Sequence, residues 1–194
     1  MYLINCSPRI LTVFSPLSEH YFFFNLVIIK TMITLRDFNE DDTTQLLSIL
    51  NDPEVVRYLS SKIPSPYTLE DAKWWISTGS QIGIVKAIDL NGLLVGCIGA
   101  EQGEFEYQRS AEIGYWIAKD YWRQGIATQA INELIALVFN TTDIIRLYAC
   151  VFSLNIASMY VLEKCGFELE SVHKKAIFKN DELYNNHVFS LLKA

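Results

Sequence analysis

A polar segment between an apolar strand and an amphipathic helix is the part of the chain best suited to bind an anion. The segment covers residues 121–128, and the apolar run 113–118 before it is typical of a β-strand. The first amides of a helix have no partner within it and carry the positive end of its dipole. With a turn at Gly125 and the cation of Arg123, they predict a phosphate or pyrophosphate site. An ordinary glycine turn is the alternative. The helix is indicated by apolar residues at three- and four-residue spacing, namely Ala127, Ala130, Ile131, Leu134, Ile135 and Val138.

A second cluster supplies more polar side chains at residues 155–167, with the sequence N-I-A-S-M-Y-V-L-E-K-C-G-F. It resembles the N-x-A-S-x-x-x-x-E-K-x-G-F segment of the GNAT acetyltransferase superfamily. Residues 111–117 and 121–130 look like the central strand and the pyrophosphate loop of the same family. A Tyr-Trp pair before the loop and the opening L-R-D-F at residues 35–38 are typical of the ribosomal-protein-alanine acetyltransferase branch. The resemblance runs from about Ile33 to Leu192, and three ordered blocks make it specific.

The resemblance implies that the chain binds acetyl-CoA as a co-substrate. The loop departs from the usual Gln/Arg-x-x-Gly-x-Gly/Ala pattern, because Trp122 holds its first position, as is common in this branch. This weakens the case for a side-chain contact at Trp122 but not the pyrophosphate site, which depends on backbone amides. Asn155 is similar to the family's pantetheine-contacting Asn, although an Asn before a helix is also an ordinary N-cap. The cofactor-binding residues implied in this way are Ile117, Ala118, Arg123, Gln124, Gly125, Ile126, Ala127, Thr128 and Asn155.

Composition predicts one packed domain. The chain has 194 residues, of which 51% are hydrophobic and 20% charged. The formal net charge of −6 argues against nonspecific binding to nucleic acid. Four cysteines show no paired spacing and no accompanying histidine cluster, so we expect neither a disulfide framework nor a metal site. A cytoplasmic protein without a membrane partner, monomeric or homodimeric, fits these features.

The hydrophobic pattern predicts a single α/β (α+β) domain with one mixed sheet. The resemblance adds that this sheet is GNAT-like, mostly antiparallel and flanked by helices. The dipeptide Asn91-Gly92 predicts a hairpin, because both turn positions need positive φ. Strands are expected at residues 33–36, 82–90, 93–100, 110–118, 145–152, 168–178 and 187–192, the last two joined by a turn at 179–182. Other helices are expected at residues 40–51, from Thr68, and at the Asn155 cluster up to a C-cap at Gly166.

Residues 1–31 differ from the remainder of the chain. Their apolar run at 21–29 is shorter than the about 20 residues of a membrane span, and the pattern of a secretory signal is missing. The family-like region begins at Met32. We therefore expect residues 1–31 to be an extension outside the fold, translation to start at Met32, and residues 32–194 to form the acetyltransferase domain. A real, partly ordered arm is the alternative, and the intact mass of the native protein tests the two.

GNAT enzymes acetylate a primary amine by direct attack, without an acyl-enzyme, so the chemistry needs a base for the amine. Glu112, on the strand before the loop, is the first candidate, acting through water. Its alternative role is to pair with a neighbouring Arg. Glu101 is the reserve candidate, although it is one of several acidic residues in its loop. At pH 7, deprotonation costs about 4.6 kcal/mol for a lysine-like amine and about 1–1.4 kcal/mol for an α-amine.

The leaving thiolate needs a proton or a hydrogen bond, and two hydroxyls are candidates. Ser158 fits the ribosomal-protein branch and Tyr160 the wider superfamily, while either could simply pack in the helix. The favoured acceptor is a protein N-terminal amine. The alternatives are a small-molecule amine (polyamine, antibiotic or metabolite) and a non-catalytic acyl-CoA-binding module. We expect the acceptor pocket to be lined from residues 56–75 and 179–186.

Overall fold

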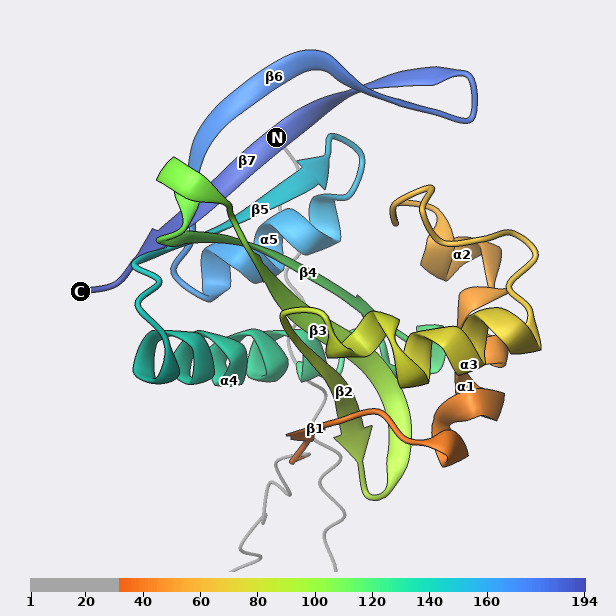
Figure 1. Cartoon of the computed structure of the whole chain (residues 1–194). Coiled ribbons are helices and arrows are strands. Elements are labelled where there is room, and N and C mark those ends of the chain that lie inside the picture. The colour runs from red at the N-terminus through yellow and green to blue at the C-terminus, as the bar shows by residue number, and fades with distance from the viewer. Residues whose placement is uncertain (1–31) are drawn as a thin grey trace, which may run out of the picture. The chain divides into compact units, whose positions relative to one another are not determined.

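The computed structural model describes residues 32–194, so the predictions made for residues 1–31 lie outside the described residues. Its centre is a seven-stranded sheet in the order β1-β2-β3-β4-β5-β7-β6. Every neighbouring pair is antiparallel except β4 and β5, which are parallel. The predicted mixed, mostly antiparallel sheet flanked by helices is confirmed (Figure 1).

The elements follow in chain order. The strands are β1 (Thr34–Arg36), β2 (Ile84–Leu90), β3 (Leu93–Gln102), β4 (Ser110–Ile117), β5 (Arg146–Phe152), β6 (Glu168–Lys179) and β7 (Glu182–Leu192). The α-helices are α1 (Thr43–Leu50), α2 (Pro53–Val56), α3 (Leu69–Ser77), α4 (Ile126–Thr141) and α5 (Ile156–Lys164). Short 3₁₀ helices cover Glu40–Asp42, Gly79–Gln81, Phe105–Tyr107 and Lys119–Tyr121.

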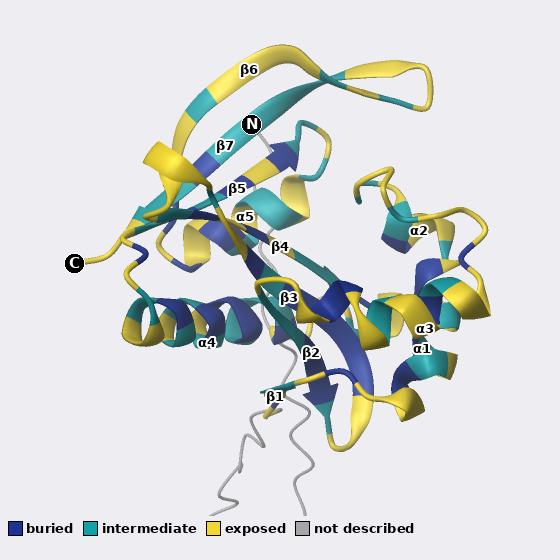
Figure 2. Ribbon diagram, in the orientation of Figure 1, coloured by how far each residue is buried: buried dark blue, intermediate teal, exposed yellow. Residues whose placement is uncertain are grey.

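Helices cover both faces of the sheet, and each face has its own core. Because successive side chains of a strand point to opposite faces, Ala87 and Ile88 belong to different cores, as do Cys97 and Ile98. One face packs against α4 and α5, and the other against α1 and α3 (Figure 1). Figure 2 shows the buried residues gathered in the central strands and on the inner side of α4, while β6 is largely exposed.

Short-range sequence patterns predict several local structures correctly. Asn91 and Gly92 have φ of 55° and 87° in the turn between β2 and β3. Gly166, just after the end of α5, has φ of 88°. Thr68 and Asp71 form a reciprocal capping box at the start of α3. These elements depend on residues close together in sequence, which is why one sequence suffices to predict them.

Two elements differ from expectation. β7 starts at Glu182 and not at residue 187, because its first residues pair with β6 across the hairpin. Their polar sequence is typical of a loop, so the prediction missed them. Helix α2 was not predicted. It is a single turn that starts with Pro53 and is capped by the Asp52 side chain, which accepts from the Glu54 N–H at 2.8 Å.

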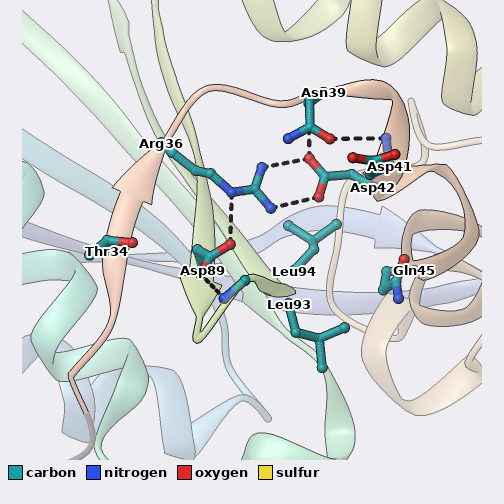
Figure 3. Close-up of a pocket in the computed structure, with 10 residues that line it drawn as sticks. Thr34, Arg36, Asn39, Asp41, Asp42, Gln45, Asp89, Leu93 and Leu94 are labelled. Atoms are coloured by element: carbon teal, nitrogen blue, oxygen red, sulfur yellow. Dashed lines mark hydrogen bonds and ion pairs between the residues drawn. The ribbon is translucent and has the colours of Figure 1, made fainter.

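Arg36 joins β1 to the first helical segment through Asp42 and to β2 through Asp89, and both carboxylates are buried (Figure 3). Its guanidinium donates to both carboxylate oxygens of Asp42 at 2.7 Å and to Asp89 at 2.7 Å. Asp42 and Asp89 are 3% and 6% exposed, so their charges depend on this partner. The hydrogen bonds to Asp42, with those to Asp89, raise the pKa of Arg36 despite partial burial. The L-R-D-F opening thus has a structural role at the far end of the sheet from the β6–β7 hairpin (Figure 1).

Candidate active site

The two parallel strands at the centre of the sheet separate along their length (Figure 1). β4 and β5 pair only where Ser110–Glu112 faces Arg146–Tyr148. Beyond these residues β4 continues to Ile117 and β5 to Phe152 without pairing to each other. A cavity of about 450 Å³ lies in this opening, within the size range of small-molecule sites. The break in the sheet therefore exposes two strand edges to one cavity.

The edge of β4 that faces the opening carries unpaired backbone groups. The Ala118 N–H donates to the Val95 carbonyl of β3 at 2.8 Å, so the neighbouring residue, Ile117, points its backbone away from β3. The same alternation turns the backbone groups of Tyr115 toward β5, which pairs with β4 only as far as Glu112. A ligand with amide groups can bind along this edge as an added strand would.

Side-chain alternation places Glu112, the candidate base, on the opposite face of the sheet from Tyr115. On β4, Ile113 and Ile117 pack in the core under α4 and α5, and Tyr115 packs against that core. Glu112 therefore points to the other face. On β5, Phe152 lies on the same face as Glu112, because Val151 is in the α4–α5 core. The opening connects the two faces, and the cavity is lined from both.

The cavity brings together some of the predicted residues. Its lining includes Glu112, Asn155 and Ser158 but not Tyr160, which is 66% exposed on α5. Parts of the two segments expected to line the acceptor pocket also line this cavity. They contribute Tyr58, Leu59, Ser60, Ser61, Lys179 and Asn186. Further lining comes from Ile113, Gly114, Tyr115, Ala149, Cys150, Val151, Phe152, Ile177 and Phe178.

Tyr115 is a site residue that the sequence analysis missed. Its hydroxyl oxygen lies 2.7 Å from Ser158 Oγ, inside the cavity lining. Burial raises the pKa of Tyr115 to about 12, and the hydrogen bond with Ser158 opposes this increase only in part. The phenol is thus protonated at neutral pH and can donate to Ser158. The sequence could have indicated this role, because Tyr115 stands among the inward-facing residues of β4 and a buried hydroxyl requires a partner.

Glu112 belongs to a row of polar side chains that crosses three strands. It pairs directly with Glu101 on β3 and with Tyr148 on β5. Glu112 and Glu101 are both exposed, and only Glu112 lines the cavity. Arg146 pairs with Glu170 and stacks 4.9 Å from the centre of the Tyr148 ring. The alternative role of Glu112, an ion pair with a neighbouring Arg, is not seen among the described residues.

The loop before α4 has the geometry of an anion site. Gly125 is the N-cap residue with φ of 79°, and the first helical hydrogen bond joins Gln129 N–H to its carbonyl at 3.0 Å. The amides of Ile126, Ala127 and Thr128 therefore have no partner within the helix. A Cβ added at Gly125 would contact no described residue within 4 Å apart from its chain neighbours, so the space beside this glycine is open. α4 has 16 residues, and its dipole adds positive potential here.

The side chains around this loop have defined positions. Arg123 is exposed with φ of 61°. Gln124 donates to the Asp120 carbonyl at 3.0 Å. Trp122, the residue that departs from the family pattern, donates from its indole N–H to the Ile117 carbonyl at 2.7 Å. Trp122 thus ties the loop to the end of β4, which is a structural reason for its presence.

Three of the predicted coenzyme contacts already have partners within the protein. The Asn155 side-chain oxygen accepts from the Ser158 N–H at 3.2 Å as an N-cap of α5. The Ile117 carbonyl and the Ala118 N–H are bonded to Trp122 and Val95 respectively. The groups that stay available for a ligand are the Ile117 N–H and the second lone pair of its carbonyl. Contact of these residues with the coenzyme stays a prediction.

Two further features bear on the kind of site. No group of three or more His, Cys, Asp and Glu side chains within residues 32–194 is placed to hold a metal ion. No helix in this part of the chain combines the length and the apolar character needed to cross a membrane.

Comparisons with known proteins identify the family of the chain. A model of the Acetyltransferase (GNAT) domain matches residues 32–168, which is more than half of the chain. The chain therefore belongs to the GNAT acetyltransferase family, and it is an acetyl-CoA-dependent N-acetyltransferase.

Two relatives and one solved structure show what the chain is similar to. The chain is 29% identical over 168 residues to YoaA of Bacillus subtilis (strain 168), an uncharacterised N-acetyltransferase, covering 83% of this chain and 93% of YoaA. It is 24% identical over 164 residues to AaaT of Escherichia coli (strain K12), an L-amino acid N-acetyltransferase, covering 83% and 98%. The structure matches RimL, a ribosomal L7/L12 alpha-N-protein acetyltransferase in complex with coenzyme A. The TM-score is 0.73 at 22% identity, over 84% of this chain and 94% of RimL.

Proposed function

We propose that this enzyme acetylates the α-amine of a protein N-terminus by direct attack of the amine on acetyl-CoA. The observation that carries the proposal is the cavity in the opening between β4 and β5. Glu112 reaches it from one face of the sheet, and the Tyr115–Ser158 pair reaches it from the other. A base and an acid can thus act on opposite sides of one reacting centre.

The residues present fit acetyl-CoA, which supplies the activated acetyl group as a thioester. The free amides of residues 126–128 and the Arg123 side chain are suited to a pyrophosphate. The unpaired edge of β4 at Tyr115 and Ile117 is suited to the amides of a pantetheine arm. The hydrogen bond from Trp122 to the Ile117 carbonyl joins the loop before α4 to the end of β4. The proposed pyrophosphate and pantetheine sites are therefore next to each other.

Glu112 is the proposed base, and it acts through a water molecule. It removes a proton from the incoming ammonium so that a neutral amine attacks the thioester carbonyl. An α-amine has a pKa near 7.7–8.0, so an exposed carboxylate is a sufficient base for it. A lysine-like amine with a pKa near 10.4 would require a stronger one. A single carboxylate beside the acceptor therefore suits an N-terminal α-amine better than a lysine-like amine.

Ser158 is the proposed donor to the leaving thiolate. When Tyr115 donates its phenolic proton to Ser158 Oγ, the serine O–H is free to point into the cavity. A thiol with a pKa near 8.5 leaves readily, so a hydrogen bond at this position is enough. Tyr160 is the second candidate, and its exposure outside the cavity is the reason that Ser158 is preferred.

A small-molecule amine is the second candidate acceptor, and the name of AaaT favours a free amino acid. The name of RimL favours a protein N-terminus. A cytoplasmic enzyme, monomeric or homodimeric, would meet either acceptor.

Isothermal titration with acetyl-CoA and with CoA tests the coenzyme site. Gly125→Asp places a carboxylate against the amides of the α4 N-terminus, and we expect it to weaken binding more than about 100-fold. Gly92→Asp is the matched control, because Gly92 also has a positive φ (87°) and open space around a new Cβ. Equal binding by Gly125→Asp and wild type would contradict the site. A folded wild-type chain that binds neither ligand would contradict the enzymatic proposal itself.

A further inference from the structure

The acceptor side of the cavity has two opposite charges. Among the residues that line the cavity, Glu112 and Lys179 alone carry a formal charge. Glu112 lies where β4 and β5 still pair, and Lys179 lies at the end of β6 next to the hairpin turn. An acceptor that fills this side therefore meets a carboxylate at one end and an ammonium at the other.

Lys179 is held in place without being neutralised. Its ammonium donates to the carbonyls of Val56 at 2.9 Å and Leu59 at 2.5 Å, and it lies 5.9 Å from the centre of the Phe152 ring. It forms no ion pair with a carboxylate of the described residues. Backbone carbonyls orient the charge but do not cancel it, so the positive potential reaches the cavity.

An unpaired hydrogen-bond acceptor lies beside Phe152 in the cavity lining. Asn186 on β7 pairs opposite Phe152 of β5 and lines the cavity. Its side-chain oxygen is buried and has no hydrogen-bond partner among the described residues. A buried acceptor without a partner is costly, so a donor from a bound molecule would stabilise it.

The spacing of these groups indicates the size of the acceptor. Tyr148, the partner of Glu112, and Phe152, the neighbour of Lys179, lie four residues apart on β5, which is about 13 Å along a strand. The amine and carboxylate of a free amino acid are too close together to use both ends. An extended peptide advances about 3.3 Å per residue, so an acidic side chain near its third residue can reach Lys179.

We propose that the enzyme selects protein N-termini that carry an acidic residue near the third position. The α-amine lies toward Glu112, a peptide N–H donates to Asn186, and the acidic side chain pairs with Lys179. This inference rests on the proposed function, because it assumes a peptide acceptor.

Peptide kinetics test the inference. The substrates are hexapeptide amides of alanine that carry aspartate, or asparagine in its place, as the second, third or fourth residue. The ratio of kcat/KM for each aspartate peptide to that of its asparagine partner reports the charge preference. The enzymes are wild type, Lys179→Gln and Lys174→Gln, the last a control that removes an exposed cation of the same strand outside the cavity lining.

We expect wild type and Lys174→Gln to favour one aspartate peptide roughly tenfold, or about 1.4 kcal/mol. In Lys179→Gln we expect this ratio to fall to about one. If the substitution acted only by removing the contacts with Val56 and Leu59, kcat/KM would fall equally for the aspartate and the asparagine peptide, and the ratio would not change. Added salt reduces the wild-type preference. A ratio of one in wild type, or an unchanged ratio in Lys179→Gln, overturns the inference and leaves the proposed function intact. If no peptide is acetylated by an enzyme that binds acetyl-CoA, both are overturned.

Discussion

The phenolic oxygen of Tyr115 lies 2.7 Å from Ser158 Oγ, although 43 residues separate them in the chain. Tyr115 comes from the strand that ends at the coenzyme loop, and Ser158 comes from the first turn of α5. The side-chain oxygen of Asn155 accepts a hydrogen bond from the Ser158 N–H, so Asn155 and Ser158 orient each other within the first turn of α5. This contact connects the two sequence clusters that resemble the GNAT family, and it lies inside the cavity.

Replacement of the two candidate hydroxyls on α5 separates their roles. We expect Ser158→Ala to lower kcat about 10- to 100-fold, because the leaving sulfur loses its donor. Tyr160→Phe should keep kcat within about twofold, since Tyr160 is 66% exposed and outside the cavity lining. Steady-state kinetics with saturating acetyl-CoA give both values. The larger loss in Tyr160→Phe would reverse the assignment.

Glu112 and Glu101 offer a matched pair of carboxylates, directly opposite on adjacent strands. We expect Glu112→Gln to lower kcat/KM at pH 7 about 100-fold, because the base is lost, and Glu101→Gln to have little effect. Raising the pH toward about 8, near the pKa of an α-amine, should restore part of the Glu112→Gln activity, since more acceptor is then neutral. Equal losses in the two variants, or no recovery with pH, would contradict the role of Glu112 as base.

The buried phenol of Tyr115 makes stability depend on pH in the alkaline range. Its pKa is raised from 10.0 to about 12, mainly by burial, so the folded protein holds this proton more tightly than the unfolded chain. The resulting stabilisation is fully present below pH 10 and is lost as the pH rises through 12. We therefore expect the stability difference between wild type and Tyr115→Phe to shrink over this range in urea unfolding experiments.

Other tyrosines and cysteines also titrate in the alkaline range, and the comparison cancels their contributions. Burial also raises the pKa values of Tyr67 and Cys97 to about 12, but both residues are present in wild type and in the variant. Tyr107→Phe, which removes a tyrosine that is 72% exposed, is the control. A constant stability difference for Tyr115→Phe from pH 8 to 12 would mean that the phenol is not buried in solution.

Arg36 should be important for stability and not for catalysis. Arg36→Met leaves Asp42 and Asp89 as buried charges without their partner, and we expect a loss of about 3–5 kcal/mol in the free energy of unfolding. Lys86→Met breaks the more exposed ion pair with Asp37 and should cost no more than about 1 kcal/mol. Urea denaturation measures both. Similar small losses would show that the network in Figure 3 is solvated in solution.

Much of the local structure could be predicted because neighbouring residues determine it. The turn at Asn91 and Gly92, the start of α4 at Gly125 and the end of α5 at Gly166 all follow from the φ that each position requires. The apolar face of α4 was predicted in the same way, and Ala130, Ile131, Leu134 and Val138 of that face are fully buried. The polar first half of β7 was missed, since its pairing with β6 across the hairpin overrides its local pattern.

The sequence by itself determined the family, the order of elements and the residue types from which a base, an acid and an anion site could be built. The tertiary structure alone decided which of these residues meet. The separation of β4 and β5 opens the cavity, and strand alternation puts Glu112 on one face and Tyr115 on the other. Contacts such as Tyr115–Ser158 join residues far apart in the chain, and their geometry follows from the packing of the whole sheet and its helices.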